Sequence, residues 1–168
     1  GYGATANSPW VGRAFPNAHL HVLADASQGV TTTAFDNGNP GRQSWNPQLA
    51  PWVFGTGGTL VPGNELMRLA ARGQRKAKMA QFTTSLDEVQ IEFYGVMKAF
   101  YGPGGTCSNP AVDWYQQMSR QLVADANDLR NFRFYLAGGS YHTLLRDSNF
   151  YNESSAGRSF SDWLGDML

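Results

Sequence analysis

The chain has 168 residues, a length typical of one globular domain with a sizeable core. Thirteen Lys and Arg residues balance thirteen Asp and Glu residues, and charged residues make up only 15% of the chain. A neutral chain without clustered cations disfavours binding to nucleic acid or to an anionic membrane surface. No apolar run approaches the ~20 residues that a membrane span requires.

The hydrophobic pattern predicts helices and strands in alternation. We expect a short helix of small residues from Gly3 to Phe15 and a buried strand over 19–24, which closes at Asp25. Two further apolar runs predict strands at 78–84 and 131–137. Further helices are expected at 65–72, from 85 onward, from 110 onward and at 161–168.

This alternation favours an α/β fold, a mostly parallel sheet with flanking helices. Three strands alone would leave a long apolar sheet edge exposed, which proteins normally avoid. We therefore expect that additional strands lie outside this sequence. The first residues, beginning at Gly1, also lack an initiator Met and the features of a signal peptide.

The helix expected after the second strand carries two local signals. Ser85 and Glu88 have the spacing of a capping box, which predicts that the helix starts at Ser85. Its apolar residues recur at helical spacing and predict a buried stripe. These residues are Leu86, Val89, Phe93, Val96, Met97 and Phe100.

Residues 26–63 show no sustained period and form a long segment rich in glycine, proline and aromatic residues. The aromatic residues are Phe35, Trp45, Trp52 and Phe54. A segment of this length is typical of a lid or a binding loop. The alternative is that its aromatic side chains simply cap the core. The pattern leaves both interpretations open.

Three titratable residues follow predicted strands, namely Asp25, Asp87 and His142. Functional groups gather at the carboxyl ends of parallel strands, and a histidine oriented by a carboxylate supplies two members of a nucleophilic triad. Each residue also has a structural interpretation. Asp25 is suited to capping a turn, Asp87 to the first turn of a helix, and His142 to a hydrogen-bonded loop.

Two serines are weak candidates for a nucleophile. Ser155 lies in a Ser-Ser-Ala-Gly run that looks like a nucleophile elbow, but Glu153 replaces the first glycine and the run follows His142. Ser8 lies inside the first predicted helix, where a local helix contact is expected.

Metal and thiol chemistry have little support in the sequence. His19 and His21 share one face of a predicted strand, but no third ligand is spaced with them, so we expect no metal site. Cys107 is the single cysteine and has no basic neighbour that would activate its thiol.

Several stretches of the sequence carry a resemblance to a known family. They are GYGA, SPW, AFP and LADASQGV within residues 1–30, QFTTSLDEVQ at 81–90, and NFRFYLAGGSYHT at 131–143. In order and spacing, the chain resembles the second half of the pectin acetylesterase/Notum family, in particular its bacterial members.

The resemblance implies an α/β-hydrolase fold and hydrolysis of carboxylic esters by a Ser-Asp-His triad in that chain order. Asp87 would be the acid and His142 the base. The serine would stand in a G-x-S-A-G-type elbow upstream of residue 1, of which Gly1 and Tyr2 are the remnant. Residues 1–168 would then be the carboxyl-terminal part of a single α/β-hydrolase domain, holding its last three strands, with the amino-terminal strands missing. The chain alone is expected to be inactive.

The resemblance further implies an ester substrate, an acetylated glycan or another acyl ester, with no cofactor and an extracellular or periplasmic location. The missing amino-terminal segment would be a partner, and Cys107 would pair with a cysteine there or remain free. Asp25, Trp45, Trp52 and Tyr141 are expected near a substrate cleft. Two alternatives stay open. One is a non-catalytic relative that binds glycans or acyl groups, and the other is a structural fragment that needs a partner chain.

Overall fold

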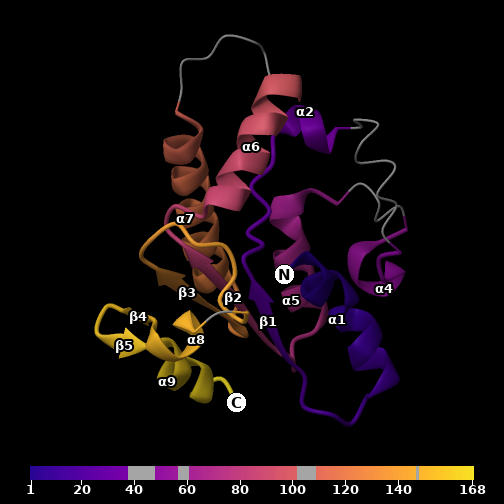
Figure 1. The fold of residues 1–168 in the computed structure, drawn as a ribbon. Coiled ribbons are helices and arrows are strands. Elements are labelled where there is room, and N and C mark those ends of the chain that lie inside the picture. Colours follow the sequence, from indigo (N-terminus) through magenta and orange to yellow (C-terminus); the bar gives the residue numbers. More distant parts are fainter. Residues whose placement is uncertain (38–47, 57–60, 102–108, 147) are drawn as a thin grey trace.

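A three-stranded parallel sheet forms the centre of the computed structural model, which describes residues 1–37, 48–56, 61–101, 109–146 and 148–168. The strands are β1 (His21–Asp25), β2 (Lys78–Thr84) and β3 (Phe132–Ala137), in the order β1-β2-β3 (Figure 1). The register pairs Asp25 with Phe82 and Thr84 with Ala137, so the carboxyl ends of all three strands lie at one edge of the sheet. The predicted α/β architecture with a parallel sheet is confirmed.

One face of the sheet is covered by the larger helices. They are α1 (Tyr2–Ala14), α5 (Leu66–Gly73), α6 (Glu88–Tyr101) and α7 (Pro110–Asp128). Alternate strand residues, including Val22, Met79 and Phe132, point into this layer. There they pack against the fully buried Trp114 and Met118 of α7. This cluster is the main core of the described residues.

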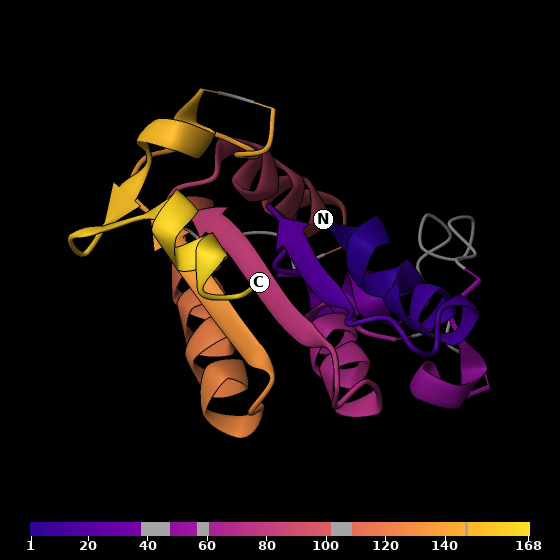
Figure 2. The ribbon, with the colours of Figure 1, turned by 90° about the horizontal axis from the view of Figure 1, so that it is seen from below.

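The opposite face of the sheet packs on the carboxyl-terminal elements. They are α8 (Asn149–Asn152), α9 (Phe160–Gly165) and a hairpin of β4 (Ser154–Ser155) and β5 (Arg158–Ser159). Figure 2 shows the yellow α9 on the side of the sheet away from the larger helices. Aromatic rings fill this second core, with ring centroids 5.5 Å apart for Phe82 and Phe160 and 5.4 Å apart for Tyr135 and Trp163.

The described part of segment 26–63 packs on the main core. It contains the short helices α2 (Thr33–Asp36) and α4 (Pro51–Phe54) and the 3-10 helix η2 (Gly63–Glu65). Phe54 is buried in the core, and Trp52 lies 4.6 Å from the Trp10 ring and 4.4 Å from the Arg13 guanidinium, both on α1. Phe54 therefore caps the core, whereas Trp52 is 44% exposed and packs on the surface of α1. Trp45 and Cys107 lie outside the described residues.

The start of α6 differs from the sequence prediction. The helix begins at Glu88, and Asp87 caps it by accepting a hydrogen bond from the Gln90 backbone N–H at 2.9 Å. Ser85 does not cap the helix, because the Glu88 backbone N–H that its hydroxyl would accept donates to the Ser140 carbonyl instead. The Ser85 backbone N–H, which a capping box would bond to Glu88, donates to the carbonyl of Ala137 at the end of β3. The predicted Ser85–Glu88 capping box is therefore wrong.

The buried face of α6 also differs from the predicted stripe. Phe93 is 62% exposed and Phe100 is 75% exposed, whereas Tyr94 is buried. Asp87, Gln90 and Tyr94 share one face of the helix because they are spaced at three- and four-residue intervals. The polar contacts of Asp87 and Gln90 place this face of the helix toward the protein interior. Phe93 and Phe100 of the predicted stripe therefore face the solvent.

A buried ion pair joins α5 to α7. Arg68 on α5 places Nε 2.7 Å and Nη2 2.6 Å from Oδ1 of Asp125 on α7. The Asp125 side chain is fully buried, and this burial raises the pKa of its carboxyl group although the Arg68 hydrogen bond and charge oppose the rise. The Arg68 guanidinium therefore supplies the counter-charge for a carboxylate that water does not reach.

We expect Arg68→Met to lower the free energy of unfolding by about 3–5 kcal/mol at pH 7, because it leaves a buried carboxylate without its counter-charge. A carboxyl group whose pKa is raised in the folded state favours folding when protonated, and this contribution is lost as the pH rises through the raised pKa. The decrease in the free energy of unfolding caused by Arg68→Met should therefore be smallest near pH ~4, the ordinary range of an aspartate pKa. This decrease should grow toward neutral pH.

Urea unfolding at the two pH values measures this difference. Arg72→Met is the matched control, because Arg72 lies on the same helix and is exposed. Equal losses for the two variants at both pH values would contradict the expectation.

Candidate functional site

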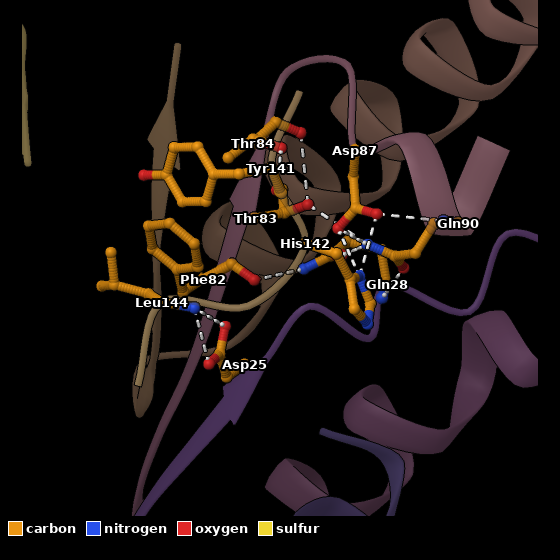
Figure 3. Close-up of polar contacts among 10 residues, drawn as sticks. All are labelled: Asp25, Gln28, Phe82, Thr83, Thr84, Asp87, Gln90, Tyr141, His142 and Leu144. Atoms are coloured by element: carbon orange, nitrogen blue, oxygen red, sulfur yellow. Dashed lines mark hydrogen bonds and ion pairs between the residues drawn. The ribbon is translucent and has the colours of Figure 1, made fainter. Parts of the chain in front are cut away.

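The turns that follow β2 and β3 lie side by side and carry Asp87 and His142 (Figure 3). Backbone hydrogen bonds join these turns, from Leu86 N–H to the Gly139 carbonyl and from Glu88 N–H to the Ser140 carbonyl, each at 3.0 Å. Gly139 has φ of +94°, a conformation that glycine adopts readily. The glycine turn thus directs the chain after β3 back toward the end of β2.

His142 and Asp87 form a close pair. Nδ1 of His142 lies 2.9 Å from Oδ1 and 3.0 Å from Oδ2 of Asp87. The Asp87 side chain is fully buried, whereas that of His142 is 30% exposed. Because a carboxylate only accepts hydrogen bonds, this contact assigns a proton to Nδ1, and in the neutral imidazole Nε2 is then the acceptor. The structure thus brings together Asp87 and His142, the two residues expected from the sequence to be an acid and a base.

Gln90 completes the hydrogen bonding of Asp87, and Gln28 in turn is hydrogen-bonded to Gln90. The Gln90 side-chain amide donates to Oδ2 of Asp87 at 2.9 Å and to Oε1 of Gln28 at 2.8 Å. Gln28 is buried and donates through its own amide to the Phe82 carbonyl at 3.0 Å. Sequence reasoning missed both residues. The spacing of Asp87 and Gln90 is a local signal for Gln90, whereas no local signal marks Gln28.

Asp25 holds the backbone next to His142. Its carboxylate accepts hydrogen bonds from the backbone N–H of Leu144, at 2.9 Å to Oδ2, and of Leu145, at 3.0 Å. Thr143, between His142 and this turn, has the unusual φ of +68°. Asp25 is buried, and these contacts give its carboxylate a structural role beside His142. It caps a turn, but a turn far along the chain rather than its own.

Tyr141 packs with the second core. Its hydroxyl donates to Oε2 of Glu153 at 2.5 Å, and its ring lies 6.2 Å from that of Phe82. Burial raises the pKa of the Tyr141 hydroxyl, and the hydrogen bond and charge of Glu153 raise it further. Figure 3 shows its ring pointing away from the His142 ring. This placement does not support the expected position of Tyr141 in a cleft beside His142.

Gly1 and Tyr2 lie where α1 begins, beside the carboxyl end of β1 (Figure 1). A Cβ atom added at Gly1 would lie 2.0 Å from Oγ of Ser27 and 2.5 Å from the carbonyl oxygen of Asp25. Only glycine fits this position without a shift of its neighbours. Atoms of Asp25 and Ser27 therefore closely approach the start of α1. This close approach lies at the same edge of the sheet that carries Asp87 and His142.

The weak serine candidates make structural contacts. Oγ of Ser155 donates to the Leu136 carbonyl at 2.7 Å, and Oγ of Ser8 donates to the Thr5 carbonyl at 2.9 Å. Within the described ranges, no serine hydroxyl is hydrogen-bonded to His142. Over those same ranges, no group of three His, Cys, Asp or Glu residues is placed to hold a metal ion, and His19 precedes the strand that His21 opens.

Comparison of the chain with protein-family models, curated proteins and solved structures gives no match. No helix in the described part of the chain combines the length and the apolar character that crossing a membrane requires. The contacts of Asp87 and His142 are therefore the main guide to function.

Proposed function

We propose that this chain belongs to a serine-type carboxylic ester hydrolase in which His142 is the general base and Asp87 orients it. One observation carries the proposal: Nδ1 of His142 lies between both oxygens of a fully buried carboxylate, while its ring remains partly exposed. A carboxylate in this position maintains the Nδ1–H tautomer and stabilises the imidazolium that forms when Nε2 accepts a proton.

The arrangement of the strands supports an α/β-hydrolase fold as the setting. Asp87 and His142 follow neighbouring parallel strands, and the acid precedes the base along the chain, as in that fold. The nucleophilic serine of such enzymes stands on a sharp turn between a strand and a helix. We place it in a segment upstream of Gly1, on the turn that leads into α1. The close approach of Asp25 and Ser27 to Gly1 supports this placement, because a nucleophile elbow requires glycine where backbone segments lie close together.

The proposed reaction has two acyl-transfer steps. Nε2 of His142 takes the proton of the serine hydroxyl as the serine oxygen attacks the ester carbonyl carbon. The imidazolium then gives this proton to the departing alcohol, which leaves an acyl-serine. In the second step His142 takes a proton from water, the hydroxide oxygen attacks the acyl carbonyl, and the serine leaves with the proton. Asp87 stays ionised throughout, and the chemistry needs no cofactor.

The resemblance supports a substrate class but no single substrate. We propose an acetylated glycan or another acyl ester as the substrate, and an extracellular or periplasmic location.

A fluorophosphonate probe tests the proposal, because it forms a covalent adduct only with an activated serine. We expect one adduct on the protein that contains this chain, at a serine upstream of Gly1, and no adduct on the 168-residue chain alone. His142→Ala should abolish labelling, whereas His19→Ala, at an exposed residue outside the site, should not. Peptide mass spectrometry locates the adduct. An unlabelled protein that nevertheless binds glycans would favour the non-catalytic alternative.

A further inference from the structure

Asp87 is held by donors other than His142, and their arrangement is specific. The Gln90 backbone N–H donates to Oδ1 and the Gln90 side-chain amide donates to Oδ2, each at 2.9 Å. One residue therefore contacts both oxygens of the carboxylate. This grip restricts rotation of the carboxylate about its Cβ–Cγ bond, and His142 lies almost equally far from the two oxygens.

The Gln90 amide is itself oriented by Gln28. Oε1 of Gln90 accepts a hydrogen bond from the Gln28 backbone N–H at 3.0 Å, while its NH₂ group donates to Oε1 of Gln28 at 2.8 Å. A flipped Gln90 amide would place its oxygen against the Asp87 carboxylate and its NH₂ group against the Gln28 N–H. Both contacts would be repulsive, so the amide has one favourable orientation.

Gln28 anchors this pair to the sheet. It follows β1, and its side-chain amide donates to the carbonyl of Phe82 in β2 at 3.0 Å. Oγ1 of Thr83, also in β2, accepts a weaker contact from the Gln90 amide at 3.3 Å. The hydrogen bonds thus run from the ends of two strands to the first turn of α6, where Asp87 lies (Figure 3).

We propose that Gln28 and Gln90 form an amide clamp whose role is to position the Asp87 carboxylate for His142. The inference rests on the proposed function, since it assigns positioning residues to the same site. Among the described residues no hydrogen bond joins either glutamine to His142, so their hydrogen bonds act on the imidazole through Asp87. The clamp keeps the carboxylate in the orientation in which it accepts the Nδ1–H proton and leaves Nε2 free to act as a base.

Gln90→Met tests the clamp, because it removes the side-chain donor while it keeps the backbone N–H and a similar volume. We expect kcat for 4-nitrophenyl acetate to fall by about 10- to 100-fold with KM nearly unchanged, since misplacement of a catalytic group mainly affects the chemical step. We also expect the ¹⁵N signals of the His142 ring to move toward a mixture of the two tautomers.

Gln81→Met is the matched control. Gln81 is a glutamine on β2 that is more buried than Gln90, and its amide donates to the Ser27 carbonyl at 2.9 Å rather than to Asp87. It should lose stability like Gln90→Met and yet keep kcat and the wild-type His142 signals. Equal effects of the two variants on kcat would overturn the clamp.

Two readouts separate this inference from the proposed function. If the wild-type protein hydrolyses the ester and Gln90→Met keeps both kcat and the His142 signals, the clamp is wrong and the function stands. If the wild-type protein hydrolyses no ester but Gln90→Met alters the His142 tautomer, the clamp stands and the function is wrong. If Gln90→Met does not fold, Gln28→Met replaces it, because it leaves Asp87 bonded to Gln90 but removes the Oε1 acceptor of the Gln90 NH₂ group and the hydrogen bond that anchors Gln28 to the Phe82 carbonyl. A smaller loss of kcat with the same tautomer change is then expected, and unchanged values overturn the clamp.

Discussion

His142→Ala is expected to lower kcat for 4-nitrophenyl acetate by about 10,000-fold or more in the protein that contains this chain and the proposed serine. The imidazole is the only group placed to receive the serine proton through Nε2 in the proposed mechanism, so its removal eliminates the base in both acyl-transfer steps. Because the His142 side chain is 30% exposed, the loss of packing is small and the fold should persist. Steady-state kinetics with the chromogenic ester measure the effect.

His19→Ala provides the control for this experiment, because His19 is exposed and lies before β1, away from His142. Its kcat should equal that of the wild-type protein. Circular dichroism of both variants checks that the fold is intact. Hydrolysis by His142→Ala at a near-normal rate would remove His142 from the mechanism and with it the proposed triad.

Asp87→Asn should lower kcat by about 10,000-fold, because the uncharged amide no longer stabilises the imidazolium. Both Asp87 oxygens also accept a hydrogen bond from Gln90. An Asn NH₂ group must therefore face one of these donors in either orientation. The substitution thus removes a charge and disturbs the positioning of His142 together.

Stability should change far less than activity in this variant, since Asn remains a favourable N-cap for α6. Asp128→Asn, at an exposed carboxylate where α7 ends, is the matched charge control. Kinetics and thermal unfolding of the two variants give the comparison. If Asp87→Asn lost activity only in proportion to lost folded protein, Asp87 would have a structural role alone.

The strands and the order of the acid and base could be predicted from the sequence. Apolar runs predicted β2 at its observed bounds, β3 within one residue of its observed start and β1 within two residues. These signals are local, because a buried parallel strand needs a continuous apolar run and its end needs turn residues. Once β2 and β3 are predicted, the positions of Asp87 and His142 in the turns after these strands follow directly.

The start and the buried face of α6 could not be predicted in the same way. The Ser85–Glu88 spacing and the stripe through Phe93 and Phe100 are good local signals, but a hydrogen bond from Ser85 to Ala137 and the contacts of Asp87 replaced them. Both contacts join segments that are far apart in the chain. A helix with more apolar residues than one face can bury is oriented by such contacts rather than by its own periodicity.

By itself, the sequence determined the α/β alternation and the positions of Asp87 and His142 after two strands. The tertiary structure decided which groups meet at the site. It joined Asp25 to Leu144 across 119 residues, Gln28 to Gln90 across 62, and Asp87 to His142 across 55. Periodicity reports only which side of an element is buried, whereas a hydrogen bond between distant segments depends on how the strand ends align in the sheet. The positions of Asp87 and His142 were therefore visible in the sequence, and the hydrogen bonds that surround them were not.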